Sequence, residues 1–593
     1  MVEPQSVWSR VERKCMHLLQ QTVYKRHLLQ VHAFMIRNSA DSNPNVLAKF
    51  ISKCFSLDLA CHARKCFDLR FHRDDSFLCN CMIKSLAGSR QFARSFALYG
   101  ELRRFTKFLP NEFTFSVIAK SCGLGIIFWE GLEIHAQAFK VGSLMDLRVS
   151  TSFINMYVGF GLVHLAAMLF DEMPEKSLVT WTALICGYAR NGLMVRAKLL
   201  YDQILVKDIP VYNVMIDGYV KLGNMAEARE VFDEMQERNV ITWTSLIYGY
   251  CKHGDVQFAR SLFDSMPEKN LLSWNTMING YSKNNKPHEA LRLFNDLLSS
   301  TCLEPDGVTI VSILPAIAGL GGLVIGNWIH SYVYKKQLAQ EVNVCTALID
   351  MYGKCGQVAM ARKVFDYLNN KGTASWNSLI NAYALNGYAN GALQAFSMMQ
   401  QERVEPNDVT MLTVLSACNH GGLIEEGKRH FESMADFGVI PKIEHYGCWI
   451  DLLGRAGWLD EAERLITRMP FEPNMKIMSS YLSSCLYYKD FVRAKRALIG
   501  AASMGTWNDG NYIMLSNLFS AECNWGSVLD VKKLMRKNGV KKEAGSSAIM
   551  IEGKIWKFIA GLTSHPQRKA IELMLDKLYS HLHRSNLNAC CSL

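Results

Sequence analysis

LVTWTALICGYARNGLMVRAKLLYDQILVKD spans residues 178–208, and IPVYNVMIDGYVKLGNMAEAREVFDEMQERN at 209–239 and VITWTSLIYGYCKHGDVQFARSLFDSMPEKN at 240–270 follow without a gap. Each block carries an aromatic residue at its fourth position, followed by Thr or Asn, so Trp181, Tyr212 and Trp243 stand 31 residues apart. The same phrase recurs at Trp274-Asn275 and Trp376-Asn377. Self-similarity at a fixed period predicts a repeat architecture in which each unit packs only on its neighbours.

Two helical patterns occur in each block. A tyrosine follows the aromatic residue by seven positions, which is two helical turns and the same face. These are Tyr188, Tyr219, Tyr250, Tyr281 and Tyr383. A second helix is indicated by a small residue four positions before an aromatic one, a spacing typical of a close helix-helix contact. These pairs are Ala166/Phe170, Ala197/Tyr201, Ala228/Phe232, Ala259/Phe263, Ala290/Phe294, Ala361/Phe365 and Ala392/Phe396.

A glycine separates the two helices in most blocks, where a left-handed cap would end the first helix and allow a short turn. These are Gly161, Gly192, Gly223, Gly254, Gly356 and Gly387. Each block leaves an apolar face that only a neighbour covers. We therefore predict an all-α fold, a right-handed superhelical solenoid of helix-turn-helix repeats, whose function lies along a concave groove.

Bulk composition excludes several classes of protein. The 593 residues carry a net charge of +11, which suits a polyanionic partner but is spread over a long chain. None of the 18 cysteines stands in C-x-x-C spacing, so we interpret residues such as Cys186 and Cys251 as small buried side chains in a reducing compartment. No apolar run is long enough to cross a bilayer, and no secretory signal core follows Met1.

These motifs resemble the plant organellar pentatricopeptide-repeat (PPR) family, in the PLS subfamily that mixes repeats of 31, 35 and 36 residues. Long repeats are indicated by 111–115, 306–310 and 407–411, and a short successor by 346–356. The units then start at Ser76, Glu112, Leu147, Leu178, Ile209, Val240, Leu271, Gly307, Val342, Thr373, Asp408 and about Lys442.

The resemblance implies a division of the chain into five parts. Residues 1–12 are a possible but ambiguous targeting segment, because the start of the chain carries Arg10, Arg13 and Lys14 but also the acidic Glu3 and Glu12. Residues 13–75 resemble two degenerate repeats, and 76–472 about twelve repeats of P, L and S type. Residues 473–543 resemble the E extension through 510–517 and 539–543, and 544–593 the E+ segment and tail through 558–561 and 564–566.

The resemblance also implies that the fifth residue of a repeat and its closing residue together read one RNA base. Thr or Ser at the fifth position is expected to read purines and Asn pyrimidines, with closing Asp favouring G or U and closing Asn A or C. The pairs are Asn80/Asn111 for C or U, Thr182/Asp208 for G, Asn213/Asn239 for C, Thr244/Asn270 for A, Asn275/Asp306 for U and Asn377/Asn407 for C, with Ser116/Asp146, Thr151/Ser177 and Thr346/Gly372 as weaker purine pairs.

Other positions refine this interpretation. Apolar residues at the second position, such as Val179, Ile241 and Leu272, would sandwich the bases. Val311 and Leu412 stand at the fifth position but cannot hydrogen-bond a base edge, so their repeats are expected to be spacers. The alternative explanation of the polar residues is that they are ordinary helix N-caps. A basic cluster at 532–542 is either a solvated helix face or a phosphate contact.

No catalytic signature is complete in this sequence. His430-Phe431-Glu432 matches the H-x-E of zinc deaminases, but no C-x-x-C follows and the match falls inside a repeat helix. We expect no metal, no cofactor and no catalysis by the chain itself, and no deaminase domain after Cys590 and Cys591. Membrane association is also not expected.

The leading hypothesis is a sequence-specific single-stranded RNA-binding protein. It would act as site-recognition factor for C-to-U editing of an organellar transcript, with a DYW-type deaminase and other editing-complex proteins as partners in trans. Mitochondrial location is favoured over chloroplast by the number of editing targets in the family. Splicing, stability or translation factors form one alternative. A tetratricopeptide-like protein scaffold forms another, although such arrays keep a nearly constant period of about 34 residues.

Overall fold

The computed structural model describes residues 10–68, 75–106, 108–300, 303–502, 509–521, 523–537, 539–540, 546–551, 554–559, 570–571 and 573–577. The chain divides into two compact units, Met1–Glu268 and Lys269–Leu593. Several predictions fall outside the described residues. They concern residues 1–9 of the targeting signal, Lys541 and Lys542 of the basic cluster, 560–566 of the E+ segment, and the tail with Cys590 and Cys591.

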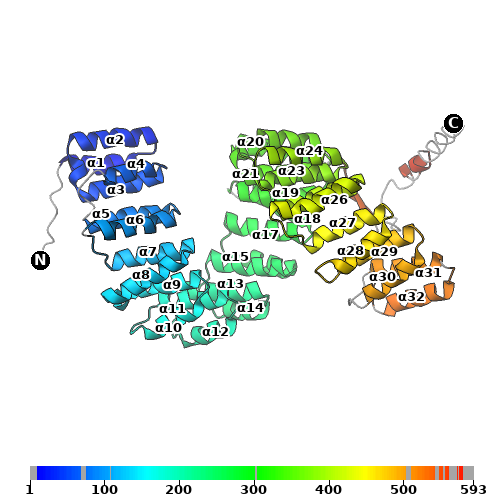
Figure 1. The fold of residues 1–593 in the computed structure, drawn as a ribbon, viewed down its shortest axis with the longest axis horizontal. Coiled ribbons are helices and arrows are strands. Elements are labelled where there is room, and N and C mark those ends of the chain that lie inside the picture. The colour runs from blue at the N-terminus through cyan, green and yellow to red at the C-terminus, as the bar shows by residue number, and fades with distance from the viewer. Residues whose placement is uncertain are drawn as a thin grey trace. The chain divides into compact units, whose positions relative to one another are not determined.

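The first unit is a succession of antiparallel helix pairs (Figure 1). Its helices are α1 (Arg10–Gln21), α2 (Lys25–Arg37), α3 (Pro44–Ser56), α4 (Ala60–Asp68), α5 (Ser76–Gly88), α6 (Phe92–Phe105), α7 (Glu112–Gly125), α8 (Phe128–Val141), α9 (Leu147–Gly159), α10 (Val163–Glu172), α11 (Leu178–Arg190), α12 (Met194–Gln203), α13 (Ile209–Leu222), α14 (Met225–Asp233), α15 (Val240–Lys252) and α16 (Val256–Ser265).

The second unit continues the same pattern of helix pairs. Its helices are α17 (Leu271–Lys283), α18 (Pro287–Ser300), α19 (Gly307–Leu320), α20 (Leu323–Lys335), α21 (Val342–Lys354), α22 (Val358–Tyr367), α23 (Thr373–Leu385), α24 (Ala389–Gln401), α25 (Asp408–Gly421), α26 (Ile424–Glu432), α27 (Ile443–Arg455), α28 (Leu459–Arg468), α29 (Met475–Tyr487), α30 (Phe491–Ala502), α31 (Asp509–Ala521) and α32 (Trp525–Lys537).

The repeat prediction and the helix boundaries agree closely. Eleven of the predicted unit starts, from Ser76 to Asp408, are the first residues of α5, α7, α9, α11, α13, α15, α17, α19, α21, α23 and α25. The twelfth, Lys442, is the N-cap of α27. The all-α solenoid of helix-turn-helix pairs is therefore confirmed for the helical part of each unit.

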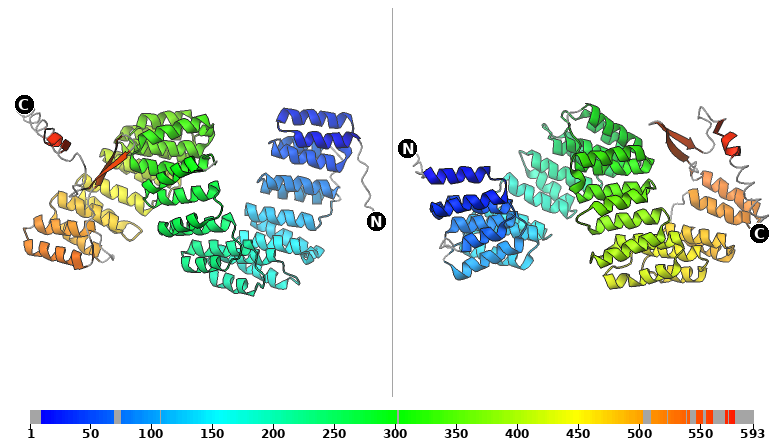
Figure 2. Two further views of the ribbon diagram at one scale, coloured as in Figure 1. Left: turned by 180° about the vertical axis from the view of Figure 1, so that it is seen from behind. Right: turned by 90° about the horizontal axis from the view of Figure 1, so that it is seen from above.

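A β-hairpin departs from the all-α prediction. Strands β1 (Ser546–Ile551) and β2 (Lys554–Ile559) pair in antiparallel register, with Ser546 opposite Ile559, and are drawn as adjacent arrows in Figure 2. The segment is rich in Ile, with Trp556 and Phe558, and such residues favour strands over helices. The helical repeat pattern ends before it, so the periodicity upstream gave no information about it.

Like helices stack side by side within each unit, as the parallel layers in Figures 1 and 2 show. The first helices of successive pairs contact one another, from α7 through α9, α11 and α13 to α15, and from α17 through the odd-numbered helices to α29. Within a unit, a second helix packs on its own first helix and, in most pairs, also on the first helix of the next pair, as α10 does on α11 and α24 on α25. The row of first helices therefore brings the same position of successive repeats together.

The alanine and aromatic residues of the second helices form the interface between pairs. Ala228 is fully buried and Phe232 is 2% exposed. The Phe232 ring meets Trp243 of the next first helix edge to face, with ring centroids 4.8 Å apart, and Phe170 meets Trp181 at the same distance. Such ring pairs add about 0.5–1.5 kcal/mol each to the burial of apolar area.

Two kinds of glycine permit this geometry. Gly161 and Gly254 lie in the left-handed region, with φ of 77° and 89°, and allow the first helix to end in a tight turn as predicted. Gly249 precedes the packed Tyr250 and sits where two first helices approach. A Cβ atom there would lie 2.7 Å from Val220. Among the described residues, no helix combines the length and the apolar character that crossing a membrane requires.

Candidate nucleic-acid interface

The predicted closing residues are N-caps of the following first helix. The side chain of Asn239 accepts a hydrogen bond from the Thr242 backbone at 2.9 Å, and Asp208 accepts one from Val211 at 3.1 Å. The same capping role is filled by Asn111, Asp146, Ser177, Asn270, Asp306 and Asn407. Gly372 has no side chain with which to cap α23. The capping explanation is therefore right for these positions, and it fixes where each side chain lies.

The fifth residues occupy a different place, one turn inside the first helix. Three of them nevertheless contact the closing residue of their own repeat. The Nδ2 atom of Asn80 donates to Oδ1 of Asn111 at 3.2 Å, and Asn275 donates to Asp306 and Asn377 to Asn407 over the same distance. Capping does not require this contact. The side-by-side packing of first helices brings the two predicted positions together.

A third residue, which sequence analysis missed, joins several of these pairs. The Thr242 hydroxyl donates to Oδ1 of Asn213 at 2.7 Å and lies 2.9 Å from Oδ1 of Asn239. Thr114 donates to Asn80, and Thr410 to Asn377, each at 2.7 Å. All three threonines are fully buried. The signal was present as a recurring Thr or Ser at the third position of the units, but buried hydroxyls at a helix start read as structural.

These hydrogen bonds set which atoms of the side chains remain available. In the Asn213/Asn239 pair, Oδ1 of each amide is engaged by the Thr242 hydroxyl or backbone. Among the described residues, Nδ2 of Asn239 has no hydrogen-bond acceptor. A closing Asn therefore offers a donor. A closing Asp in the same position caps with Oδ1 and offers its second oxygen as an acceptor.

The threonines at the fifth position are held differently. Their hydroxyls donate to the backbone carbonyl one turn earlier, at 2.6 Å for Thr151, 2.7 Å for Thr182 and Thr346, and 2.9 Å for Thr244. Two of them also reach the third-position hydroxyl of the next helix. Thr151 lies 2.9 Å from Thr180, and Thr346 lies 3.1 Å from Ser375.

Not every predicted pair is brought into contact. Within the part of the chain that the structure describes, no hydrogen bond joins Thr182 to Asp208 or Ser116 to Asp146. For Thr182 and Asp208, the third position of the next repeat is Val211, which has no hydroxyl that could link the two side chains. Thr244 and Asn270 belong to different compact units. Val311 and Leu412 are partly exposed on α19 and α25, as apolar fifth residues.

Asp306 carries a negative charge that its hydrogen bonds stabilise. Burial acts to raise the pKa of its carboxyl group. The backbone N–H and hydroxyl of Thr309 and the amide of Asn275 outweigh that effect, and the pKa of Asp306 is lowered from its usual value. The carboxylate therefore stays ionised near neutral pH and keeps an acceptor oxygen on this surface.

A cavity of about 770 Å³ opens beside the pair Thr151/Ser177. The second-position Val179 lines it, and so do Lys120 and Arg148. Arg190 lines the cavity too. Within the described residues, Lys120, Arg148 and Arg190 form no ion pair. Val179 is 65% exposed, and Ile241 and Leu272 are 56% and 51% exposed at the same repeat position. An apolar platform, polar side chains and basic side chains that lie together are typical of a surface that binds single-stranded nucleic acid.

Comparison with known proteins identifies the architecture. The PPR repeat model matches residues 149–178, 179–209, 210–240, 241–271, 344–373 and 444–472, and the PPR repeat family model matches 269–318 and 371–420. The E motif model matches 488–550. The Arabidopsis thaliana pentatricopeptide repeat-containing protein At2g44880 is 54% identical over 555 residues, which cover 93% of this chain and 100% of that protein. The chain belongs to the pentatricopeptide-repeat family.

Other relatives and solved structures agree with this PPR assignment. The Arabidopsis thaliana protein ELI1, chloroplastic, is 37% identical over 573 residues, covering 95% of this chain and 79% of that protein. The crystal structure of maize PPR10 has a TM-score of 0.54 at 17% identity and covers 90% of this chain and 89% of its own. PPR10 in complex with an 18-nt psaJ RNA element gives a TM-score of 0.50 at 17% identity, covering 91% and 82%. These structures show that the PPR fold is shared.

Two further sequence features of this PPR protein have a clear structural setting. His430 lies in α26 and packs edge to face on Phe396, with centroids 5.4 Å apart, and burial lowers its pKa. It is thus a half-buried packing side chain of a repeat helix. On α32, Lys532, Lys533, Arg536 and Lys537 are exposed, with Lys533 3.6 Å from Asp530. That face is solvated and remains open to a phosphate contact.

Proposed function

We propose that this PPR protein binds single-stranded RNA and recognises its sequence through the fifth and closing residues of its repeats. The observation that carries the proposal is the direct hydrogen bond between these two positions in Asn80/Asn111, Asn275/Asp306 and Asn377/Asn407. Side chains that lie in contact can address one base together. The presence of an RNA element in the maize PPR10 complex supports the same kind of ligand.

The hydrogen-bond arrangement gives a physical reason for the expected base preferences. The Watson–Crick edges of G and U each present a ring N–H donor, whereas those of A and C present a ring nitrogen acceptor. The free acceptor oxygen of a closing Asp, as in Asp306, suits the donor of U or G. The free Nδ2 donor of a closing Asn, as in Asn239, suits C or A. Fifth-position residues would add the distinction between purine and pyrimidine.

We further propose that recognition serves C-to-U editing of an organellar transcript. The E motif at 488–550 supports this assignment, because it follows the repeats where a partner could be held next to the bound RNA. Catalysis would come from a DYW-type deaminase within an editing complex, acting in trans. An organellar location is part of this proposal, and it is supported by relatives such as ELI1, which is named chloroplastic. Between the two organelles, the proposal favours the mitochondrion.

The first test is a gel shift with the full chain at fixed salt, since phosphate contacts make affinity salt-dependent. One RNA carries consecutive G, C, A and U for the units starting at Leu178, Ile209, Val240 and Leu271, in each of the two strand polarities, and the control has the same bases shuffled. Specific binding requires preference for one ordered RNA. Equal, weak binding to every RNA would contradict base recognition and favour a protein scaffold.

The second test addresses the editing role. Organellar cDNA from a plant lacking this protein is sequenced and compared with that from a plant complemented by the intact chain. Loss of one C-to-U event that complementation restores is the expected result. If editing is intact in the plant that lacks the protein but a spliced or stable transcript is lost there, the protein would instead be assigned to splicing or transcript stability.

A further inference from the structure

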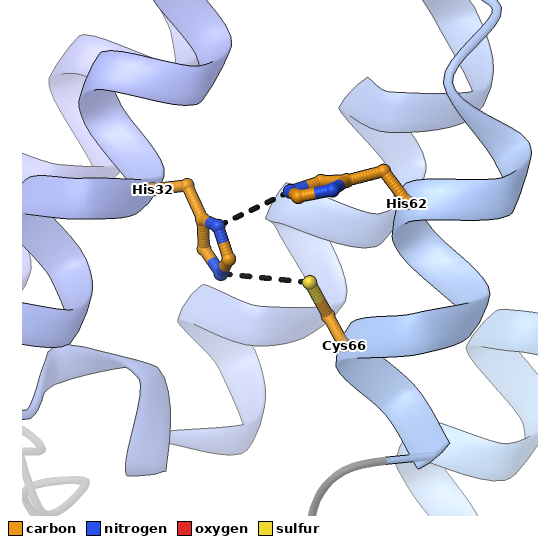
Figure 3. A group of neighbouring side chains, drawn as sticks. All are labelled: His32, His62 and Cys66. Atoms are coloured by element: carbon orange, nitrogen blue, oxygen red, sulfur yellow. Dashed lines mark hydrogen bonds between the residues drawn. The ribbon is translucent and has the colours of Figure 1, made fainter.

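Two histidines and a cysteine meet in the first unit. His32 lies on α2, and His62 and Cys66 lie one turn apart on α4, as Figure 3 shows. Nδ1 of His32 is 3.2 Å from Nε2 of His62, and Nε2 of His32 is 3.5 Å from Sγ of Cys66. Taking one ligand atom from each side chain, all three lie within 4.8 Å of one another.

The packing around this cluster holds its rings in place. The His32 ring stacks on Phe50 of α3, with centroids 4.5 Å apart and planes 16° apart. His62 meets the His32 ring edge to face at 5.0 Å. Phe50 is fully buried, whereas both histidines are half-buried and so remain reachable from solvent. A site that is held by the buried Phe50 ring and partly exposed at its two histidines suits a ligand that enters from water.

We propose that His32, His62 and Cys66 bind a divalent zinc-type cation. One thiolate and two imidazoles form a donor set that Zn²⁺ prefers, and water would complete a tetrahedron. Ligand atoms of such a tetrahedron are about 3.5 Å apart, given Zn–N and Zn–S distances of roughly 2.1 and 2.3 Å. Small side-chain rotations that move the ligand atoms by roughly 1 Å would bring them from at most 4.8 Å to that spacing. The Cys66 thiol loses its proton on binding.

Neighbouring cysteines do not compete for this role. Cys54 is fully buried on α3 and is not one of the three residues whose ligand atoms come together. Cys61 is exposed on α4 but does not join the cluster. The bound cation would cross-link α2 to α4, tying together two helices that belong to successive pairs.

The probe is Co²⁺, added to the full chain after removal of metals with a chelator. Binding to the cluster predicts one equivalent of Co²⁺ with a thiolate-to-cobalt charge-transfer band, displaced by Zn²⁺. Cys66→Ser and His32→Ala should each weaken Co²⁺ binding by more than the roughly 10- to 100-fold typical of losing an outer-shell partner. Matched controls are Cys61→Ser on the same helix as Cys66, and His27→Ala on the same helix as His32, and both should keep the band.

A second readout does not depend on the spectrum. Zn²⁺ should slow amide hydrogen exchange in 25–37 and 60–68 of the wild-type chain, and not in Cys66→Ser, because a cross-link suppresses local opening. No charge-transfer band in the wild-type protein, or an equal band in Cys66→Ser, would overturn the proposal. The RNA gel shift is scored separately, so a metal-free protein that still recognises its RNA would refute only the metal site.

Discussion

The amide of Asn377 donates a 3.2 Å hydrogen bond to Oδ1 of Asn407, which at the same time caps α25 by accepting from the Thr410 backbone at 2.9 Å. One atom thus serves helix stability and the alignment of a candidate base-reading pair. The Nδ2 atom of Asn407 has no acceptor among the described residues. Capping and alignment therefore depend on Oδ1, whereas a base contact would use Nδ2, so a substitution that changes only the second atom tests base recognition separately.

Replacing Asn239 by Asp should change base preference without loss of stability. Asp keeps the cap on α15 and adds a negative charge at a helix N-terminus, which contributes about 0.3–1 kcal/mol. The free donor becomes an acceptor, so preference at one base should move from C toward U in gel shifts. Asn239→Ala is the control. It should lose the preference and about 1 kcal/mol of stability. Unchanged relative affinities for the two bases in Asn239→Asp would exclude the two-residue model for this unit.

Removing the bridging hydroxyl should loosen the same pair. Thr242→Val keeps the shape of the side chain but deletes the hydrogen bond to Asn213, and should cost about 1 kcal/mol in thermal unfolding. Discrimination between C and U at that unit should fall, while total affinity changes little. Thr276→Val serves as control, since among the described residues that hydroxyl bonds only to the Leu272 carbonyl of its own helix. Equal effects of both substitutions on discrimination would show that the bridge is irrelevant.

The N-terminus of α19 should weaken in acid. The pKa of Asp306 is lowered in the folded state, so its stabilising effect is present above the unfolded value of about 3.9 and is lost as pH falls further through the folded value. The protection of α19 amides, which is the intrinsic exchange rate relative to their observed rate at the same pH, should therefore be constant between about pH 5 and 8. It should fall below about pH 4. Asp306→Asn should remove most of that acid dependence, and persistence of the full effect would point to another carboxylate.

Arg148 should contribute affinity without sequence preference. It lines the cavity beside Thr151 and Ser177 and is exposed. Arg148→Gln should weaken binding to all RNAs by a similar factor and reduce the slope of affinity against salt by about one unit or less. Arg104→Gln, an exposed arginine on α6 that does not line the cavity, is the control. A loss confined to one RNA sequence would mean that Arg148 reads a base.

The turn between paired helices should require glycine, because its backbone lies in the left-handed region. Gly161 has a φ of 77° and open space where a Cβ would lie, so Gly161→Ala tests conformation alone and should cost about 1–2 kcal/mol. Gly88 ends α5 and also has open space, and Gly88→Ala should be neutral or stabilise by up to about 1 kcal/mol. Comparable unfolding temperatures for the two variants would contradict the left-handed cap.

Much of the site was visible in the sequence because the repeat itself fixes relative position. Once the aromatic residue was taken as the fourth position, Leu178 and Ile209 were found as helix starts, and Asn239 could be assigned as a closing residue. Thr242 was overlooked because a hydroxyl three residues into a helix has an ordinary structural role. Only its contact with Asn213, 29 residues earlier, shows that it belongs to the pair.

The sequence by itself determined the helix pairs, the turn glycines and the order of repeats, because these depend on local periodicity and backbone preference. The tertiary structure decided which side chains meet. The contact of Asn80 with Asn111 arises from the side-by-side packing of α5 and α7. His32 meets His62 and Cys66 because α2 and α4 both pack on α3. Residues that lie 30 or more positions apart in the chain are brought within hydrogen-bond distance only by that packing, which no local pattern encodes.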